Sequence, residues 1–360
     1  MKCDLAIAGL GPVGAFGCGR EALLAALADG RSPVGTTSLA TPAGPVELPA
    51  FLADTASLER FVARRELRRI DHFSRMALLG AFLALEDAGM LGMERSRLGL
   101  VIASGYGAMR TTFTFLDSVF SGGDALASPT PFSNSVHNAA AAHVSMLLRA
   151  IGPSLTVSQF EMSVPSALLS AALWLVEERV DAVLFGGVDE CGELLHYCWQ
   201  RFFPAAGEAR MQPLDFQRQS AVAGEGAAFM VLTRAADTIR PYARIRQVAQ
   251  GNGAGVQPPL PQDAVLFLGA DGHHRCGAAY GGLPAAAALA AYAPLYGSLP
   301  VGPAFDLTLA ALSCRQGRLF PGPPGSCRGF DGAGETLAGR SICCLKYGSE
   351  GDYGLIRVES

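Results

Sequence analysis

The chain has 360 residues, half of them hydrophobic and 17% charged, and its formal net charge is -4. That length and apolar content supply a large buried core. No apolar run approaches the ~20 residues that a membrane-spanning helix needs, and the arginines form no basic tract that could neutralise phosphates. We therefore expect neither a membrane nor a nucleic acid as a partner. The nine cysteines contain no CxxC pair, so neither a zinc site nor a disulfide framework is expected.

Short β-rich runs alternate with longer alanine- and leucine-rich stretches through the first two thirds of the chain. This alternation predicts strands and crossover helices around largely parallel sheets. The expected strands are 5–9, 98–104, 154–158, 182–187 and 227–232. The expected helices are 21–30, 75–89 and 166–179, in which apolar residues recur at every third or fourth position. The first strand follows the N-terminus almost at once and does not resemble a signal peptide, which predicts a cytoplasmic location.

The same rhythm returns more weakly after the proline-rich stretch near 257–261. Here we expect strands at 264–270, 340–348 and 353–358, and helices near 282–292 and at 305–314. The pattern predicts two copies of a βαβαβαββ unit, an N-terminal half over 1–240 and a shortened C-terminal half over 241–360. A duplicated unit of this kind is the layout of the thiolase-like fold, an α/β architecture with five layers, αβαβα.

Several segments resemble the β-ketoacyl synthase family, and they follow one another in the family's order. The resemblance spans nearly the whole chain and weakens past about residue 255. The segments that carry it are LAIAGLGPVGAFGCGREALLAALADGRSP, FSRMALLGAFLALEDAG, FSNSVHNAAAAHVSMLLRAIGPSLTVS, LFGGVDE and PLDFQRQSAVAGEGAAFMVL.

The resemblance implies four catalytic positions, and each is altered in this chain. The family uses a cysteine thiolate at a helix N-terminus to take the acyl chain, two histidines for decarboxylation and a lysine that orders the site. The cysteine position falls on Glu161, in SQFEMSVP, and the histidine positions fall on Asp271 and Ser298. The lysine position falls on Ala293, and the closing loop reads KYGSEGDYG. A thioester attacked by Glu161 would give a mixed anhydride that water cleaves, so condensation by this chain alone is not expected.

Each of these positions also has an ordinary structural interpretation. Glu161 could cap the helix that follows it, which we favour over proton transfer in an apolar pocket. Asp271 could accept a backbone hydrogen bond in its loop or face the pocket. His273 and His274 lie just beyond it, where solvent exposure is favoured over a place in the pocket.

Two further regions carry expectations about partners. Thr112, Phe113, Phe115 and Phe120 occupy the region that, by resemblance to paired polyketide synthases, would gate the end of an acyl tunnel; helix packing is the alternative. The strand formed by Ser154, Leu155, Thr156, Val157 and Ser158 is expected at a sheet edge, in the strand order 3-2-1-4-5. A bare apolar edge invites pairing with a second chain, so we expect a dimer through this strand.

The leading hypothesis is a non-condensing subunit similar to a chain-length factor of polyketide, aryl-polyene or fatty-acid-type biosynthesis. The resemblance implies pairing with an active ketosynthase, or with a second copy, and contact with an acyl carrier protein, without a cofactor or metal. In chain-length factors glutamine typically replaces the cysteine, and Glu161 departs from that pattern as well. The alternatives are a diverged thiolase-fold enzyme that uses Glu161 as an acid or base on an acyl thioester, and an inactive homodimeric acyl-binding scaffold.

Overall fold

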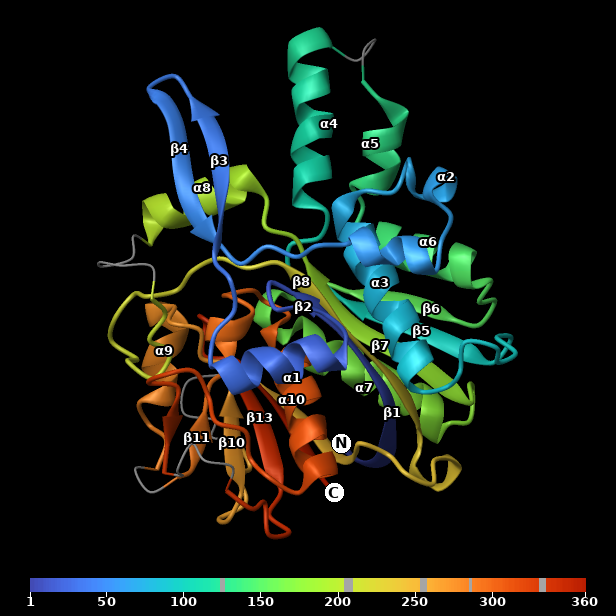
Figure 1. The fold of residues 1–360 in the computed structure, drawn as a ribbon, viewed down its shortest axis with the longest axis vertical. Coiled ribbons are helices and arrows are strands. Elements are labelled where there is room, and N and C mark those ends of the chain that lie inside the picture. Colours follow the sequence, from blue (N-terminus) through green and yellow to red (C-terminus); the bar gives the residue numbers. More distant parts are fainter. Residues whose placement is uncertain (124–126, 204–209, 253–257, 285–286, 330–334) are drawn as a thin grey trace.

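The computed structural model describes all residues except 124–126, 204–209, 253–257, 285–286 and 330–334 (Figure 1). The strands are β1 (Lys2–Gly14), β2 (Gly17–Cys18), β3 (Gly35–Thr41), β4 (Gly44–Ala50), β5 (Leu98–Ala103), β6 (Ser154–Val157), β7 (Ala182–Asp189), β8 (Gly226–Arg234), β9 (Ala243–Gly251), β10 (Val265–Leu268), β11 (Leu289–Ala290), β12 (Cys327–Arg328), β13 (Ile342–Tyr347) and β14 (Tyr353–Glu359).

The α-helices are α1 (Arg20–Asp29), α2 (Arg64–Leu67), α3 (His72–Asp87), α4 (Met109–Gly122), α5 (Pro129–Asn134), α6 (Ala139–Leu148), α7 (Ser163–Val176), α8 (Glu193–Phe202), α9 (His274–Tyr280) and α10 (Gly302–Gln316). Short 3-10 turns include η3 (Phe160–Met162) and η5 (Ala293–Leu295). No helix in the described part of the chain is long and apolar enough to cross a membrane.

The two halves of the chain repeat one strand order. Along the sheet the N-terminal strands run β6-β5-β7-β8-β1, and the C-terminal strands run β11-β10-β13-β14-β9. Numbered within each half, both read 3-2-4-5-1. Antiparallel pairing of β1 with β9 joins the two half-sheets at their edges. The repeat confirms the duplicated thiolase-like fold.

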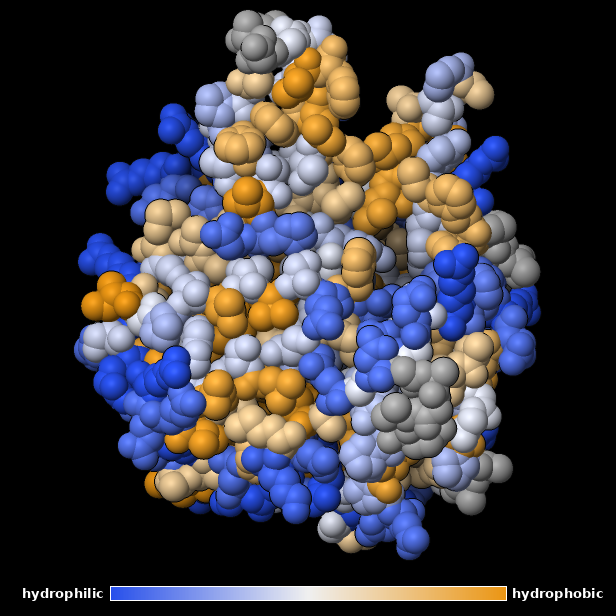
Figure 2. Space-filling model, turned by 180° about the vertical axis from the view of Figure 1, so that it is seen from behind, coloured by the Kyte–Doolittle hydropathy of each residue, from blue (hydrophilic) through white to orange (hydrophobic). Residues whose placement is uncertain are grey.

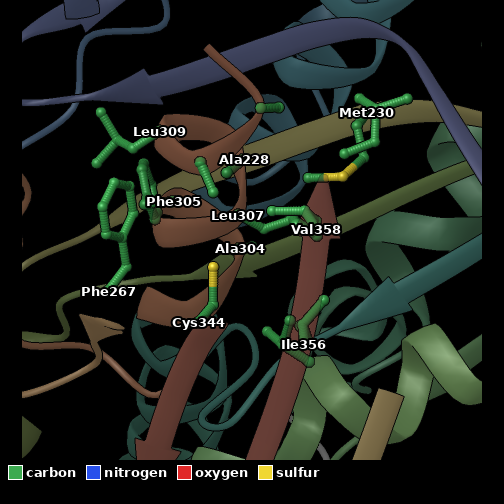
Figure 3. Close-up of a cluster of buried hydrophobic side chains, with 14 of the residues drawn as sticks. Ala228, Met230, Phe267, Ala304, Phe305, Leu307, Leu309, Cys344, Ile356 and Val358 are labelled. Carbon is green, nitrogen blue, oxygen red and sulfur yellow. The ribbon is translucent and has the colours of Figure 1, made fainter. Parts of the chain in front are cut away.

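Two central helices separate the half-sheets. Helices α7 and α10 contact each other and strands from both halves, whereas α3 and α6 cover the outer face of the first half-sheet and α9 covers the second. Every residue of α10 from Gly302 to Cys314 is buried. Figure 3 shows Ala304, Phe305, Leu307 and Leu309 of this helix among side chains from β8, β10, β13 and β14. The helical and sheet layers therefore alternate as αβαβα.

The structure corrects two expectations. The strand order 3-2-1-4-5 is wrong, because β1 pairs with β8 and β9 instead of lying between β5 and β7. The helix near 282–292 is also wrong: Leu289 and Ala290 form β11, which pairs in parallel with β10, while residues 285–286 lie outside the described part. This alanine-rich segment has helical propensity, but pairing with a buried strand overrides it.

Two projections rise from the same end of the molecule. One is the hairpin of β3 and β4, and the other consists of α4 and α5 (Figure 1). No side chain of α4 is fully buried in this chain. Apolar residues cover much of the α4–α5 projection in the reverse view of Figure 2. The core therefore lies below the projections, around the half-sheets and their helices.

Candidate functional site

Glu161 lies in η3, the turn that leads from β6 into α7. The preceding Phe160 has a φ of 44°, in the left-handed region that bulky residues rarely adopt. Ser163 holds the turn closed, because its hydroxyl accepts a hydrogen bond from the backbone N–H of Gln159 at 2.8 Å and is 2.7 Å from the carbonyl of Phe160. The turn presents Glu161 at the start of α7, the place where the resemblance puts a nucleophile.

Glu161 does not cap α7. The cap residue of that helix is Met162, and no side chain accepts a capping hydrogen bond there. The contact of Glu161 is with Cys276, whose Sγ donates to Oε1 at 3.9 Å. The capping interpretation is therefore wrong: the carboxylate contacts Cys276 of α9 instead of the free N–H groups of its own helix.

Cys276 was not foreseen as a site residue. It lies in α9 and is buried, and burial is the largest cause that raises the pKa of its thiol, to about 12. Because its pKa is raised, Cys276 stays a protonated thiol near neutral pH. Only the thiolate form is a strong nucleophile. It does not replace the missing cysteine nucleophile.

Asp271 and Ser298 lie in direct contact. The Ser298 hydroxyl donates to Asp271 Oδ2 at 2.8 Å, and the backbone N–H of His273 donates to Oδ1 at 3.1 Å. The backbone hydrogen bond expected for Asp271 is therefore present, and its second oxygen is bonded to Ser298. His273 is half-buried, with its ring stacked on Trp199 at 5.6 Å, and His274 is exposed.

Lys346 completes this network from β13. Its ammonium donates to Asp271 Oδ2 at 3.2 Å and to the carbonyl of Gly269 at 2.8 Å, and its side chain is only 3% exposed. Burial alone would lower the pKa of Lys346, but Asp271 and the neighbouring groups hold it well above its usual value. Burial would likewise raise the pKa of Asp271, but Lys346 keeps it below the usual range. The pair is therefore charged: carboxylate, ammonium and hydroxyl satisfy one another.

The structure brings a lysine to the site, but not at Ala293. That residue lies in η5 and is buried in the hydrophobic core. Lys346 enters from a different strand, and apart from Lys2 it is the only lysine in the chain. A lone lysine inside the apolar run ICCLKYG was the signal that could have identified it, since an unpaired lysine is almost never fully buried.

Tyr106 forms a wall of the site and is held by a buried carboxylate. Asp189, at the end of β7, accepts hydrogen bonds from the Ser104 hydroxyl at 2.8 Å and from the backbone N–H groups of Gly105 and Tyr106 at 2.9 Å. Burial raises the pKa of Asp189 to about 6, although these donors work against it. Burial also raises the pKa of the Tyr106 phenol, and the charges of Asp189, Glu161 and Asp271 add to the shift. The phenol is therefore neutral.

The gate candidates and the edge strand lie apart from this network. Thr112 hydrogen-bonds within α4, Phe115 packs on Phe132 of α5 with ring centroids 5.2 Å apart, and Phe120 is 83% exposed. Phe113 is half-buried in the same helix. Strand β6 lies at the end of the sheet, as expected, and pairs in parallel with β5.

The polar groups of the site have no nucleophile among them. Within the described residues no cluster of His, Cys, Asp and Glu could hold a metal ion. The arrangement offers a carboxylate beside a neutral thiol, and a separate ion pair that is already satisfied. It can bind or position a polar group more readily than it can attack a thioester.

Comparisons with known proteins identify the fold and the family. The chain has the ketosynthase-type thiolase-like fold, and residues 3–238 match the family described as "Beta-ketoacyl synthase, N-terminal domain". The chain therefore belongs to the β-ketoacyl synthase family.

Two curated relatives illustrate the sequence similarity. A protein of Streptomyces virginiae named as a polyketide β-ketoacyl synthase is 30% identical over 63% of this chain and 57% of its own length. The 3-oxoacyl-[acyl-carrier-protein] synthase 2 of Vibrio cholerae is 24% identical over 48% of this chain and 44% of its own length. The matches thus span only about half of each relative.

Solved structures match the entire chain at low identity. The ishigamide ketosynthase/chain length factor superposes with a TM-score of 0.79 at 18% identity, covering 100% of both chains. One chain from the structure of a type II polyketide synthase acyl-carrier protein in complex with its ketosynthase also matches. Its TM-score is 0.78 at 16% identity, again over 100% of both chains. At this identity the matches establish the shared fold.

Proposed function

We propose that this chain is a non-condensing ketosynthase-like subunit that pairs with an active ketosynthase, as a chain-length factor does. The observation that carries the proposal is the replacement of the nucleophile position by Glu161, together with the satisfied Asp271–Ser298–Lys346 network at the histidine positions. A structural neighbour titled as a ketosynthase/chain length factor supports the same assignment. The pathway would be of the polyketide, aryl-polyene or fatty-acid type.

The chemistry of the site supports loss of condensation. The resemblance implies two histidines for decarboxylation, and at these positions the chain carries Asp271 and Ser298, which have no imidazole. Lys346 neutralises Asp271, and two of its three N–H donors are committed to Asp271 and Gly269. The roles proposed for Glu161, Asp271 and Ser298 are therefore positional and not catalytic.

Strand β6 supports the proposed pairing. Its outer edge has no strand partner among the described residues, and α6 and α7 contact the strand. These helices and their flanking turns expose large apolar side chains: Met146, Ile151, Phe160, Leu173 and Val176. An unpaired edge flanked by exposed apolar groups favours continuous sheet formation with a second chain. We propose Ser154 to Ser158 as the centre of that interface.

Helix α4 supports the proposed gate. Its aromatic face is not buried within this chain, and Phe120 and Phe132 of the α4–α5 projection are 83% and 57% exposed. A partner chain that covered this projection would contact the side chains of α4, among them Thr112, Phe113, Phe115 and Phe120. We propose that these side chains close the end of the partner's acyl tunnel. The carrier protein, seen with a ketosynthase in one structural neighbour, would dock mainly on the active partner.

The proposed halves divide near residue 240, between the end of β8 at Arg234 and the start of β9 at Ala243. The identical strand order on both sides supports this division. The shortened C-terminal half still contributes Asp271, Ser298 and Lys346. Both halves are therefore needed for the site.

Co-expression with a ketosynthase encoded beside this chain tests the proposal. We expect a stable 1:1 complex by light scattering, and condensing activity that depends on the partner's cysteine and not on Glu161. Ser154→Lys, which places a charge at the exposed start of β6, should prevent the complex, whereas Ser38→Lys on the exposed hairpin should not. A homodimer that hydrolyses acyl thioesters, and loses that activity in Glu161→Ala, would show that the enzyme alternative is correct.

A further inference from the structure

An open pocket lies between the start of α1, the end of α10 and the segment that joins β8 to β9. It has a volume of about 400 Å³, enough for a small organic molecule, and it shares no lining residue with the candidate site. Three arginines and two carboxylates line it: Arg20, Arg240, Arg315, Glu21 and Asp87. The proposed function assigns no role to any of them.

Both carboxylates of this lining are already paired with Arg20. The Arg20 guanidinium donates to Glu21 Oε1 from Nε at 2.9 Å and from Nη2 at 2.6 Å, and its Nη1 donates to Asp87 Oδ1 at 3.1 Å. Asp87 Oδ1 also accepts the Tyr242 hydroxyl at 3.0 Å, and its Oδ2 accepts the backbone N–H of Leu10 at 2.9 Å. Neither acid is therefore left to neutralise the other two arginines.

Arg240 and Arg315 are the cations of the pocket without a carboxylate partner. Both side chains are exposed, and no ion pair among the described residues includes either of them. The Arg315 guanidinium is nevertheless positioned, because Nη1 donates to the backbone carbonyls of Arg240 and Pro241 at 3.4 and 3.5 Å. Its carbon also lies 5.9 Å from the centre of the Tyr242 ring. The Nε and Nη2 groups of Arg315 stay available to a ligand.

We propose that this pocket binds a small phosphate monoester with a hydroxylated body. Two planar guanidinium forks match the three acceptor oxygens and nearly two negative charges of such a group better than the two oxygens and single charge of a carboxylate. Gln316 adds a carboxamide whose oxygen accepts from Arg318 Nε at 2.9 Å, so its amide donors face no competing acceptor in the described chain. The apolar side chains of the lining are few, which favours a polar body over a hydrocarbon one: Ala8, Leu24 and Leu312.

The charges of the lining also predict a dependence on salt. Three arginines and two carboxylates leave a single net positive charge in the pocket. The attraction of a phosphate is therefore local to Arg240 and Arg315, and dissolved ions screen it because both side chains reach the solvent. Binding should be strongest at low salt.

Isothermal titration calorimetry of the full chain with glycerol 3-phosphate tests the site. We expect saturable binding that weakens several-fold when sodium chloride is raised from about 0.02 M to about 0.3 M, with weaker binding of glycerate and none of glycerol. Arg315→Gln should weaken binding by at least about tenfold, and Arg240→Gln by a smaller factor because no contact fixes that guanidinium. Arg65→Gln removes an exposed positive charge from α2, outside the pocket lining, and should leave the affinity unchanged.

Three outcomes would overturn the proposal. Equal affinity for glycerate or glycerol would show that the phosphate group is not what the pocket recognises. Equal losses in Arg315→Gln and Arg65→Gln would show that the overall charge of the protein, and not this pocket, attracts the anion. No saturable binding at low salt would mean that water alone solvates Arg240 and Arg315. The comparisons of ligands and of salt use the unaltered chain, so they decide the matter even where a variant fails to fold.

Discussion

Two buried polar clusters of this protein differ in how completely their members are paired. In the first, Asp271, Ser298 and Lys346 satisfy one another across short distances. In the second, Glu225 is bonded to His72 at 2.8 Å and lies 3.5 Å from Arg110, but neighbouring Glu190 keeps an oxygen without a partner among the described residues. Both are shielded from water, so the difference lies in pairing and not in exposure.

The difference bears on how much each cluster contributes to stability. A fully paired network rigidifies a site, whereas a buried polar atom without a partner costs stability. The first cluster includes the two positions to which the resemblance assigns histidines, and Glu190 of the second cluster lines a pocket together with Tyr106 and Ser298. Changes that unpair the first cluster should therefore cost the most stability, and changes in the second should cost less.

The largest effect is expected for Lys346→Met. The substitution keeps the length of the side chain but leaves Asp271 as a buried, uncompensated carboxylate. We expect a loss of about 3–5 kcal/mol in the free energy of unfolding, measured by urea denaturation at pH 7. Adding Asp271→Leu to this variant should recover most of the loss, because both buried charges are then gone.

A surface pair provides the control for that variant. Arg97 and Asp181 form an ion pair at 2.8 Å, but both side chains are about half exposed. Arg97→Met should change the free energy of unfolding far less than Lys346→Met does, because solvent screens the exposed pair. Equal losses for Lys346→Met and Arg97→Met would mean that water reaches the first cluster and that its pairing is not decisive.

An intermediate, pH-dependent effect is expected for Glu190→Gln. The folded protein raises the pKa of Glu190 to about 7 through burial, above its unfolded value. The protonated group thus favours folding at low pH, and this contribution is lost as the pH rises through 7. Glutamine does not titrate and can still accept from Arg110. Relative to the unaltered chain, the variant should gain stability between pH 5 and pH 8, on the order of 2 kcal/mol.

Urea denaturation at the two pH values measures this gain. Glu47→Gln, at an exposed carboxylate of β4, should show no comparable change with pH. Parallel pH profiles for Glu190→Gln and the unaltered chain would indicate that Glu190 titrates normally. In that event a partner must already complete the second cluster, and the contrast between the clusters would be lost.

The sequence predicted the major strands because their apolar runs are long and buried on both sides, as in β5 and β7. It predicted α3, α7 and α10 from their helical periodicity. It did not predict the β3–β4 hairpin or α8, in which most side chains are exposed or half-buried. Strand order was wrong because the choice of neighbours depends on contacts between residues far apart in the chain, such as β1 with β9.

The candidate site was only partly predictable for the same reason. Alignment with the family's motifs assigned Asp271 and Ser298 to the two histidine positions, and these two residues are in contact. It could not place Lys346 or Cys276, which reach the site from β13 and α9 through the fold of the C-terminal half. Alignment with the family can locate Glu161, Asp271 and Ser298. It cannot locate their contacts Cys276 and Lys346, which lie in other parts of the chain.

The smallest effect is expected for His72→Gln, at the paired side of the second cluster. Burial alone would lower the pKa of His72, but the hydrogen bond and charge of Glu225 outweigh it and raise the pKa above its usual value. The contribution to stability is therefore complete below about pH 6.5 and is lost as the pH rises through the folded pKa. The variant should lose on the order of 1 kcal/mol at pH 6 and less at pH 8.5. His137→Gln, at an exposed histidine, is the control. A loss that stays constant across this range would mean that His72 is neutral in the folded protein. Arg110 would then be the one positive charge that balances Glu225, and the positive charge near Glu190 would be smaller.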